Sequence, residues 1–194
     1  MRALITCGPT WVAIDAMRVI SNRSTGEMGR LIAACFRKIK VKVTLLEGPM
    51  SFDEFAKKFK AECVKKYDIV VHAAAVSDFK PKSASKGKLG SDQALNLRLV
   101  PTEKLVNAVK RLSPGTFLVG FKLESNLARA VKEAKGLFTD AGCDLVVANS
   151  MARGYQGCVI DADGNVLVKA ANKKNLAETL ARILLKKDLS LRSR

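Results

Sequence analysis

The sequence predicts an α/β fold class: a doubly wound, Rossmann-like, mostly parallel sheet with a flap loop and a C-terminal hairpin. Two observations lead to this prediction. Apolar runs of strand length alternate with amphipathic stretches of helical spacing along most of the 194 residues. No internal repeat and no proline-rich or glycine-rich linker divides the chain, so its core is expected to form one domain.

The N-terminal half predicts three strands separated by two helices. The apolar runs Ala3–Cys7, Val41–Leu46 and Asp68–Ala75 have strand length, and the last reads as fully buried. Between them, Gly26–Lys38 carries apolar residues at helical spacing and Phe52–Lys66 is amphipathic. This alternating order favours parallel strands.

A long polar segment then interrupts the pattern. Residues 76–94 are polar, contain proline and glycine, and resemble a mobile flap over a site. Leu95–Val100 alternates like an edge strand. Thr102–Leu112 predicts a helix that Thr102 caps.

The alternation resumes in the C-terminal half. Thr116–Leu123 and Asp144–Asn149 predict strands on either side of a helix at Asn126–Asp140. Val159–Asp161 and Val166–Lys169 flank the turn pair Asp163-Gly164 and predict a hairpin. Lys173–Lys187 predicts the last helix. We therefore expect one domain over residues 1–187 and a frayed basic tail at 188–194.

Composition narrows the function classes. The formal net charge of +16 favours an anionic partner. Nucleic acid is the less favoured choice, because aromatic residues make up only 6% and the lysines are scattered along the chain. Five cysteines without CxxC spacing indicate reduced thiols rather than a disulfide framework or a zinc site. With no apolar run near the ~20 residues of a membrane span, a cytoplasmic protein is expected.

The segment Ile20–Gly29 is the strongest candidate for a binding site. It places Asn22, Ser24 and Thr25 just before a helix start spaced by glycines. Ser24 or Thr25 can cap the helix, and the free N–H groups of its first turn can bind phosphate. In an open parallel sheet, ligands lie beyond the carboxyl ends of the strands, where this segment falls.

A dinucleotide-dependent reductase is one alternative. Glu47 ends the second strand about twenty residues after the glycine loop, where a ribose-binding acid is usually found. The loop argues against this class, because G-x-G-x-x-G must follow the first strand directly and here only Gly8 does. A basic nucleotide-binding or RNA-binding module without catalysis is the other alternative.

Four ordered motifs resemble the phosphopantothenoylcysteine synthetases, the phosphopantothenate–cysteine ligases of coenzyme A biosynthesis, nearly from end to end. The first loop and helix start carry Gly8-Pro9-Thr10, Ile14-Asp15, Arg18-Val19-Ile20-Ser21-Asn22, Ser24-Thr25-Gly26 and Met28-Gly29. The later motifs are Ala73-Ala74-Ala75-Val76-Ser77-Asp78-Phe79, Gly120-Phe121-Lys122-Leu123-Glu124 and Asp144-Leu145-Val146-Val147-Ala148-Asn149. Motifs in this order are far more specific than a lone glycine loop.

The resemblance implies a two-step ligation. The carboxylate of 4′-phosphopantothenate attacks the α-phosphate of a nucleoside triphosphate, CTP in preference to ATP, and pyrophosphate leaves. The amine of L-cysteine then displaces CMP from the acyl-cytidylate. The family further implies Mg²⁺ and a homodimer. The flavin-dependent decarboxylase domain that often precedes this one has no counterpart in these residues, so we expect a stand-alone ligase, with a domain excised from a longer protein as the alternative.

The family's functional residues carry over to matching positions. Asn22 would orient the acyl-nucleotide, and Lys88 resembles the flap lysine that the family brings over the triphosphate. Nucleotide-binding roles are implied for Gly8, Ser24, Thr25, Gly26, His72, Ala73, Ala74, Asp78, Thr102, Lys104, Phe121 and Lys135. Among these, Asp78 would act through Mg²⁺, and Phe121 with the backbone of residues 72–74 would line the base.

Some positions depart from the family pattern. Arg23 stands where relatives often have histidine, and Thr102-Glu103-Lys104 replaces the usual Asn-Pro-Asp or Thr-Pro-Lys. The family has a second nucleotide-contacting lysine, and its position is occupied here by Thr139 or Ala141, depending on where an alignment gap is placed. Each proposed site residue also has a plain alternative: a turn asparagine for Asn22, a solvated loop charge for Lys88, and core packing for Phe121.

Overall fold

A seven-stranded sheet forms the centre of the protein. The structure is a computed structural model that describes residues 1–192 and the side chains of residues 1–186. The strands are β1 (Arg2–Cys7), β4 (Lys42–Glu47), β6 (Ile69–His72), β9 (Phe117–Glu124), β10 (Leu145–Ser150), β11 (Gln156–Asp161) and β12 (Val166–Ala170). Their order is β12-β11-β10-β9-β6-β1-β4. The last five in this order are parallel, and β11 and β12 extend one edge as the antiparallel hairpin that Asp163-Gly164 predicts.

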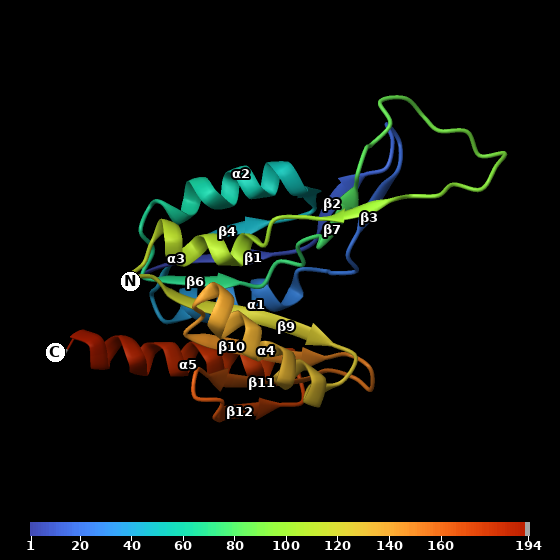
Figure 1. The fold of residues 1–194 in the computed structure, drawn as a ribbon. Coiled ribbons are helices and arrows are strands. Elements are labelled where there is room, and N and C mark those ends of the chain that lie inside the picture. Colours follow the sequence, from blue (N-terminus) through green and yellow to red (C-terminus); the bar gives the residue numbers. More distant parts are fainter. Residues whose placement is uncertain (193–194) are drawn as a thin grey trace.

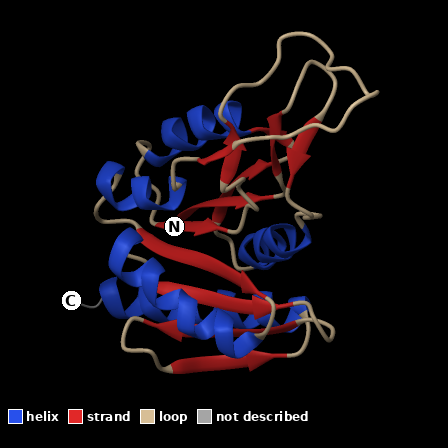
Figure 2. Cartoon of the chain, turned by 45° about the vertical axis from the view of Figure 1, so that its right-hand side comes forward, coloured by secondary structure: helices blue, strands red, loops and turns tan. Residues whose placement is uncertain are grey.

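Helices cover both faces of this sheet, as Figures 1 and 2 show. Helices α1 (Glu27–Lys38) and α5 (Lys173–Arg192) pack on one face. The other face carries α2 (Phe52–Cys63), α4 (Leu127–Ala141) and the short α3 (Ala108–Leu112), which follows the 3-10 turn η1 (Leu105–Asn107). The predicted doubly wound, mostly parallel fold is confirmed.

Two small sheets were not predicted. One joins β2 (Thr10–Ala13), β3 (Val19–Ser21) and β5 (Met50–Ser51), and the other is the ribbon of β7 (Phe79–Pro81) and β8 (Leu99–Pro101). The predicted edge strand at Leu95–Val100 is therefore wrong over 95–98, because no strand pairs with those residues. The predicted flap likewise contains β7, and its loop portion is 82–98.

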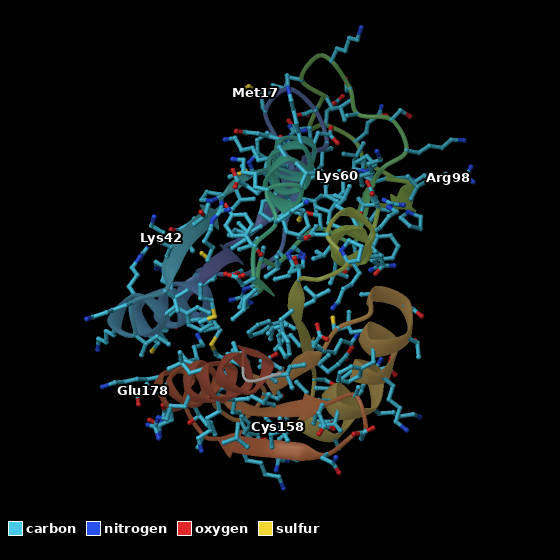
Figure 3. The ribbon with its side chains drawn as sticks, turned by 90° about the vertical axis from the view of Figure 1, so that its left-hand side faces the viewer. Met17, Lys42, Lys60, Arg98, Cys158 and Glu178 are labelled. Atoms are coloured by element: carbon cyan, nitrogen blue, oxygen red, sulfur yellow. The ribbon has the colours of Figure 1, made fainter. Side chains whose placement is uncertain are left out.

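These strands build an arm, which we define as β2, β3, β7, β8, the turn 14–18 and the loop 82–98. The loop extends beyond the sheet and helices in Figure 1, on the side opposite both termini. Figure 3 places Met17 and Arg98 on the arm, far from the sheet strand that holds Cys158. The arm is a projection rather than part of the central layers.

Asp15 anchors the loop to the rest of the arm. Its buried carboxylate accepts hydrogen bonds from the backbone N–H groups of Met17 and Arg18, both at 2.8 Å, and of Leu89 at 3.1 Å. The Ser85 N–H donates to the Ile14 carbonyl at 3.0 Å. The hydrogen bonds from Met17, Leu89 and Arg18 hold the pKa of Asp15 below its usual value.

Several boundaries differ from prediction, among them the end of the strand predicted over Asp68–Ala75, which stops at His72, and three of the others follow. Thr102 does not cap a helix, since its hydroxyl donates to the Ser77 carbonyl at 2.6 Å and only η1 and α3 follow. Helix α2 ends at Cys63, before Lys66 adopts a positive φ of 55°. Helix α5 continues to Arg192, into the predicted tail, of which residues 193–194 lie outside the described residues. No helix within the described residues is long and apolar enough to cross a membrane.

Candidate functional site

A cleft of about 1350 Å³ lies at the carboxyl ends of the parallel strands. Its walls are the start of α1, the segment after β6, η1, the end of β9 and one side of α4. In Figure 1 the arrowheads of β6 and β9 point toward this end, from which the arm also extends. The position is the one that the strand order predicts for a ligand.

The cleft brings together most of the residues that the resemblance implies. Ten of the fourteen line it: Asn22, Ser24, Thr25, Gly26, His72, Ala73, Ala74, Asp78, Lys104 and Phe121. The other four, Gly8, Lys88, Thr102 and Lys135, do not. Lys88 is on the loop of the arm, next to the anchored Leu89, and Lys135 is exposed on α4. The roles of all fourteen residues are untested predictions.

The start of α1 leaves backbone donors available. Gly26 takes the capping position with φ 74°, and no side chain caps the helix. The expected capping by Ser24 or Thr25 is therefore wrong: Ser24 Oγ accepts from the Gly26 N–H, and Thr25 Oγ1 accepts from the Glu27 N–H at 3.4 Å. A first turn of this kind suits an anion.

Gly8 supports this turn from behind. It has φ 80°, and a Cβ built on it would lie 2.9 Å from the Gly48 carbonyl oxygen. A Cβ on Gly26 would in turn meet the Gly8 nitrogen at 3.1 Å. Gly8 thus allows close packing of backbone on backbone, which holds the α1 start in place.

The side chain of Asn22 is held in one orientation. Its Nδ2 donates to the carbonyl oxygens of Ala75 at 3.3 Å and Val76 at 2.9 Å. Two carbonyl acceptors require the amide nitrogen on that side, so Oδ1 is the atom left for a ligand. Asn22 can therefore accept a hydrogen bond from a substrate but has no spare donor for a phosphate oxygen.

His72 contributes shape rather than proton transfer. Burial lowers its pKa to about 4, so the imidazole is neutral at pH 7. Nδ1 lies 3.0 Å from Thr6 Oγ1, and the ring packs 4.7 Å from that of Phe59. Burial similarly raises the pKa of the Cys7 thiol to about 11, which makes it a poor nucleophile at neutral pH.

Asp78 supplies a carboxylate to the opposite wall. It pairs with Lys104 at 2.5 Å, and both side chains are 61% exposed. Within the described residues no cluster of three or more His, Cys, Asp or Glu side chains could hold a metal ion. A single carboxylate fits Mg²⁺ that is bound mainly by substrate phosphates.

The cleft does not share the strong positive charge of the chain. Four cations and five carboxylates line it: Arg23, Lys104, Lys122 and Lys173, with Glu27, Asp78, Glu103, Glu133 and Asp140. Three of the four cations are already paired: Lys104 with Asp78, Lys122 with Glu124 and Lys173 with Glu27. A polyanion entering the cleft must therefore gain cations from exchanged ion pairs, from a metal ion or from another segment.

Among the lining residues to which sequence reasoning gave no role, two carry polar groups that matter for the site: Asn149 and Lys173. Asn149, in a motif that was noted but given no role, has a buried Oδ1 without a hydrogen-bond partner in the described part of the chain. Lys173 reads as an ordinary lysine at a helix start. Nothing in the sequence near Lys173 signals its partner Glu27, which is 146 positions away.

Comparisons with known proteins match the chain to one family over almost its whole length. Residues 1–188 match the family described as the DNA/pantothenate metabolism flavoprotein C-terminal domain. The coenzyme A biosynthesis bifunctional protein CoaBC of Thermococcus kodakarensis is 41% identical over 166 residues, 77% of this chain and 41% of that protein. Its counterpart in Bacillus subtilis is 32% identical over 195 residues, 89% of this chain and 46% of that protein. The chain spans less than half the length of these curated relatives.

Solved structures share the fold at low sequence identity. The DNA/pantothenate metabolism flavoprotein from Streptococcus pneumoniae has a TM-score of 0.81 at 23% identity, covering 96% of this chain and 99% of that one. A Cab2 mutant in complex with phosphopantothenate-cysteine has a TM-score of 0.84 at 17% identity, covering 100% and 89%. These similarities establish the architecture of the chain.

Proposed function

The chain belongs to the family of the DNA/pantothenate metabolism flavoprotein C-terminal domain, and from this premise we propose that it is a phosphopantothenate–cysteine ligase of coenzyme A biosynthesis. One observation carries the proposal beyond family membership. Segments 21–28, 72–78 and 121–123, which are far apart in the sequence, meet in one cleft at the carboxyl ends of the strands. A relative with the same fold was solved with phosphopantothenate-cysteine, the product of such a reaction.

The proposed first step joins two anions. A carboxylate oxygen of 4′-phosphopantothenate forms a bond to the α-phosphorus of CTP, and the bond from that phosphorus to the β-phosphate oxygen breaks, which releases pyrophosphate. The α1 start binds phosphate oxygens through its backbone N–H groups. Asp78 would hold Mg²⁺, which neutralises the triphosphate when bound. Lys88 would reach the triphosphate by movement of the arm loop.

The proposed second step forms the amide bond. The amine nitrogen of cysteine attacks the acyl carbon, CMP leaves, and the nitrogen loses a proton. Asn22 suits this step, because its free Oδ1 can accept a hydrogen bond from the attacking amine and so orient the nitrogen lone pair. As a neutral amide it adds no group that would hydrolyse the acyl-cytidylate.

No structural observation favours the alternatives. Glu47, which a dinucleotide site would use for ribose, pairs with Arg30 and lies outside the cleft. A non-catalytic RNA-binding module would be expected to concentrate basic residues at its binding site, whereas the cleft lining is balanced in charge.

The direct test is release of pyrophosphate. We expect the protein to release pyrophosphate when CTP, 4′-phosphopantothenate and Mg²⁺ are present, and CMP when cysteine is added. Removing Mg²⁺ with EDTA should abolish both, because the cleft has few free cations to neutralise a triphosphate. A coupled pyrophosphate assay with CTP and ATP in parallel gives the nucleotide preference. Release with neither nucleotide would reject the ligase proposal.

We also propose that two copies of the chain associate through the arm. Large apolar side chains are exposed there, including Met17 at 73%, Phe79 at 53% and Leu99 at 43%. Exposed apolar groups gathered on one projection are typical of an interface between chains. The charged loop would lie beside this interface.

Replacing two of these side chains tests the interface. We expect Phe79→Glu with Leu99→Glu to turn a dimer into a monomer in size-exclusion chromatography with light scattering, because a dimer would bury both carboxylates without partners. Val64→Glu is the matched control, since Val64 is 54% exposed at the end of α2, outside the arm. A monomeric wild type, or a double variant that stays dimeric, would contradict the proposal.

A further inference from the structure

The ion pair between Lys173 and Glu27 joins the first turns of α5 and α1 at the edge of the cleft. Nζ of Lys173 lies 2.5 Å from Oε2 of Glu27. Both residues line the cleft, and the Lys173 side chain is 25% exposed. Neither has a role in the function proposed above.

The position of Lys173 at the start of α5 is electrostatically unfavourable for that helix. Asn172 caps α5 by accepting the Asn175 N–H at 2.8 Å, so Lys173 is the first helical residue. Backbone dipoles make a helix N-terminus positive, and a lysine there is electrostatically unfavourable. Glu27 offsets this cost, and the hydrogen bond from Lys173 in turn lowers the pKa of Glu27. A residue that breaks a local rule in a cleft points to a role in binding.

The uncapped start of α1 identifies the ligand group. Its backbone N–H groups suit phosphate, but the carboxylate of Glu27 lies in the same turn and would repel it. Among the cations of the cleft, only Arg23 is without an ion pair in the described part of the chain. Lys173 is the cation paired with Glu27 in this turn, so a change of partner would bring its positive charge to a phosphate bound here.

We propose that Lys173 exchanges Glu27 for the terminal phosphates of the bound nucleoside triphosphate. Lys173 is then a triphosphate-binding residue, and Glu27 holds it in place while the cleft is empty. The inference rests on the proposed function for the identity of the ligand. The inference predicts a contact between Lys173 and the β- or γ-phosphate, which CMP lacks. A change at Lys173 should therefore affect the binding of CTP more than the binding of CMP.

Three charge-neutralising variants test the exchange by isothermal titration calorimetry with CTP and CMP. Lys173→Gln should weaken CTP binding about tenfold, the loss expected for one charged hydrogen bond, and change CMP binding less than about twofold. Lys174→Gln is the matched control, because Lys174 is exposed in the same turn and does not line the cleft. It should leave the affinities for both nucleotides within about twofold of wild type.

Glu27→Gln removes the same ion pair from the other side. It should lower the melting temperature about as much as Lys173→Gln does. It should also tighten CTP binding severalfold, because Lys173 no longer has to break an ion pair before it binds the phosphates. Opposite changes in CTP affinity at similar stability cannot come from a merely structural ion pair.

Several results would overturn the inference. One is a Lys173→Gln variant that binds CTP like Lys174→Gln, or that loses CTP and CMP affinity equally. Another is a Glu27→Gln variant that weakens CTP binding as Lys173→Gln does. A wild type that binds CTP without releasing pyrophosphate in the assay above rejects only the proposed function, whereas one that binds neither CTP nor CMP rejects both.

Discussion

Asn22→Ala is expected to slow ligation by about 100-fold or more while CTP affinity stays within a few-fold of wild type. In the proposed reaction, the free Oδ1 of Asn22 accepts a hydrogen bond from the attacking amine of cysteine in the second step and makes no contact with phosphate. Loss of this positioning group should let the acyl-cytidylate accumulate. Single-turnover experiments that follow pyrophosphate and CMP separately measure the two steps.

The same substitution removes the donor for two carbonyl groups. Ala75 and Val76 each lose a hydrogen bond from Nδ2, so the free energy of unfolding should fall by about 1–3 kcal/mol. Asn126→Ala is a control of similar cost, because Asn126 caps α4 by accepting the Arg129 N–H at 2.8 Å and does not line the cleft. If Asn22→Ala loses CTP binding together with turnover, the residue is structural and the proposed role is wrong.

The strands and helices of the central layers were predictable because their burial is regular. Strands covered on both faces, such as β6 and β10, read as continuous apolar runs. In α2 the buried residues Phe52, Phe55 and Phe59 recur at helical spacing. These patterns are local, so they can be recognised in the sequence before the fold is known.

The strands of the arm carry no comparable signal. They have three or four residues each, and they pair with residues distant in the sequence: Thr10 of β2 pairs with Met50 of β5, and Phe79 of β7 with Pro101 of β8. Whether such a segment is a strand depends on what it meets in space. The expected strand at Leu95–Val100 had the alternation but lacked the partner over its first four residues.

For the candidate site too, local motifs could be recognised in the sequence, whereas contacts between distant residues could not. Motifs with an order along the chain indicated Asn22, Asp78 and the α1 start, which do line the cleft. The pairing of Lys173 with Glu27 and the orientation of Asn22 depend on contacts between separate elements. Such contacts set which atom of a side chain is available, and they cannot be recognised from local patterns in the sequence.

The role of Gly29 likewise depends on a contact between separate elements, and replacing Gly29 has the largest expected effect on stability. Gly29 belongs to the glycine-spaced helix start that the sequence marks as a candidate binding site, but the structure places β1 against it. A Cβ built on Gly29 would lie 2.3 Å from the Cβ of Cys7 and 3.1 Å from the Thr6 carbonyl oxygen. Gly29 therefore sets the distance between α1 and the sheet.

We expect Gly29→Ala to lower the free energy of unfolding by about 3 kcal/mol, the upper range for an overpacked core, because the clash with β1 is relieved only by moving α1 away from the sheet. Gly136→Ala is the matched control in α4, where the nearest atom to a new Cβ is 3.8 Å away. It should raise the free energy of unfolding by about 0.5–1 kcal/mol through helix propensity. Urea denaturation measures both changes.

The displacement of α1 should also reach the cleft. If the helix moves away from β1, its first turn moves relative to Asp78 and Phe121, and CTP binding should weaken in Gly29→Ala at temperatures where the variant is folded. Adding Cys7→Gly removes the opposing Cβ, so the double variant should lose less stability than the two single changes predict together. Strict additivity, or a Gly29→Ala variant as stable as wild type, would show that α1 is not positioned by this contact.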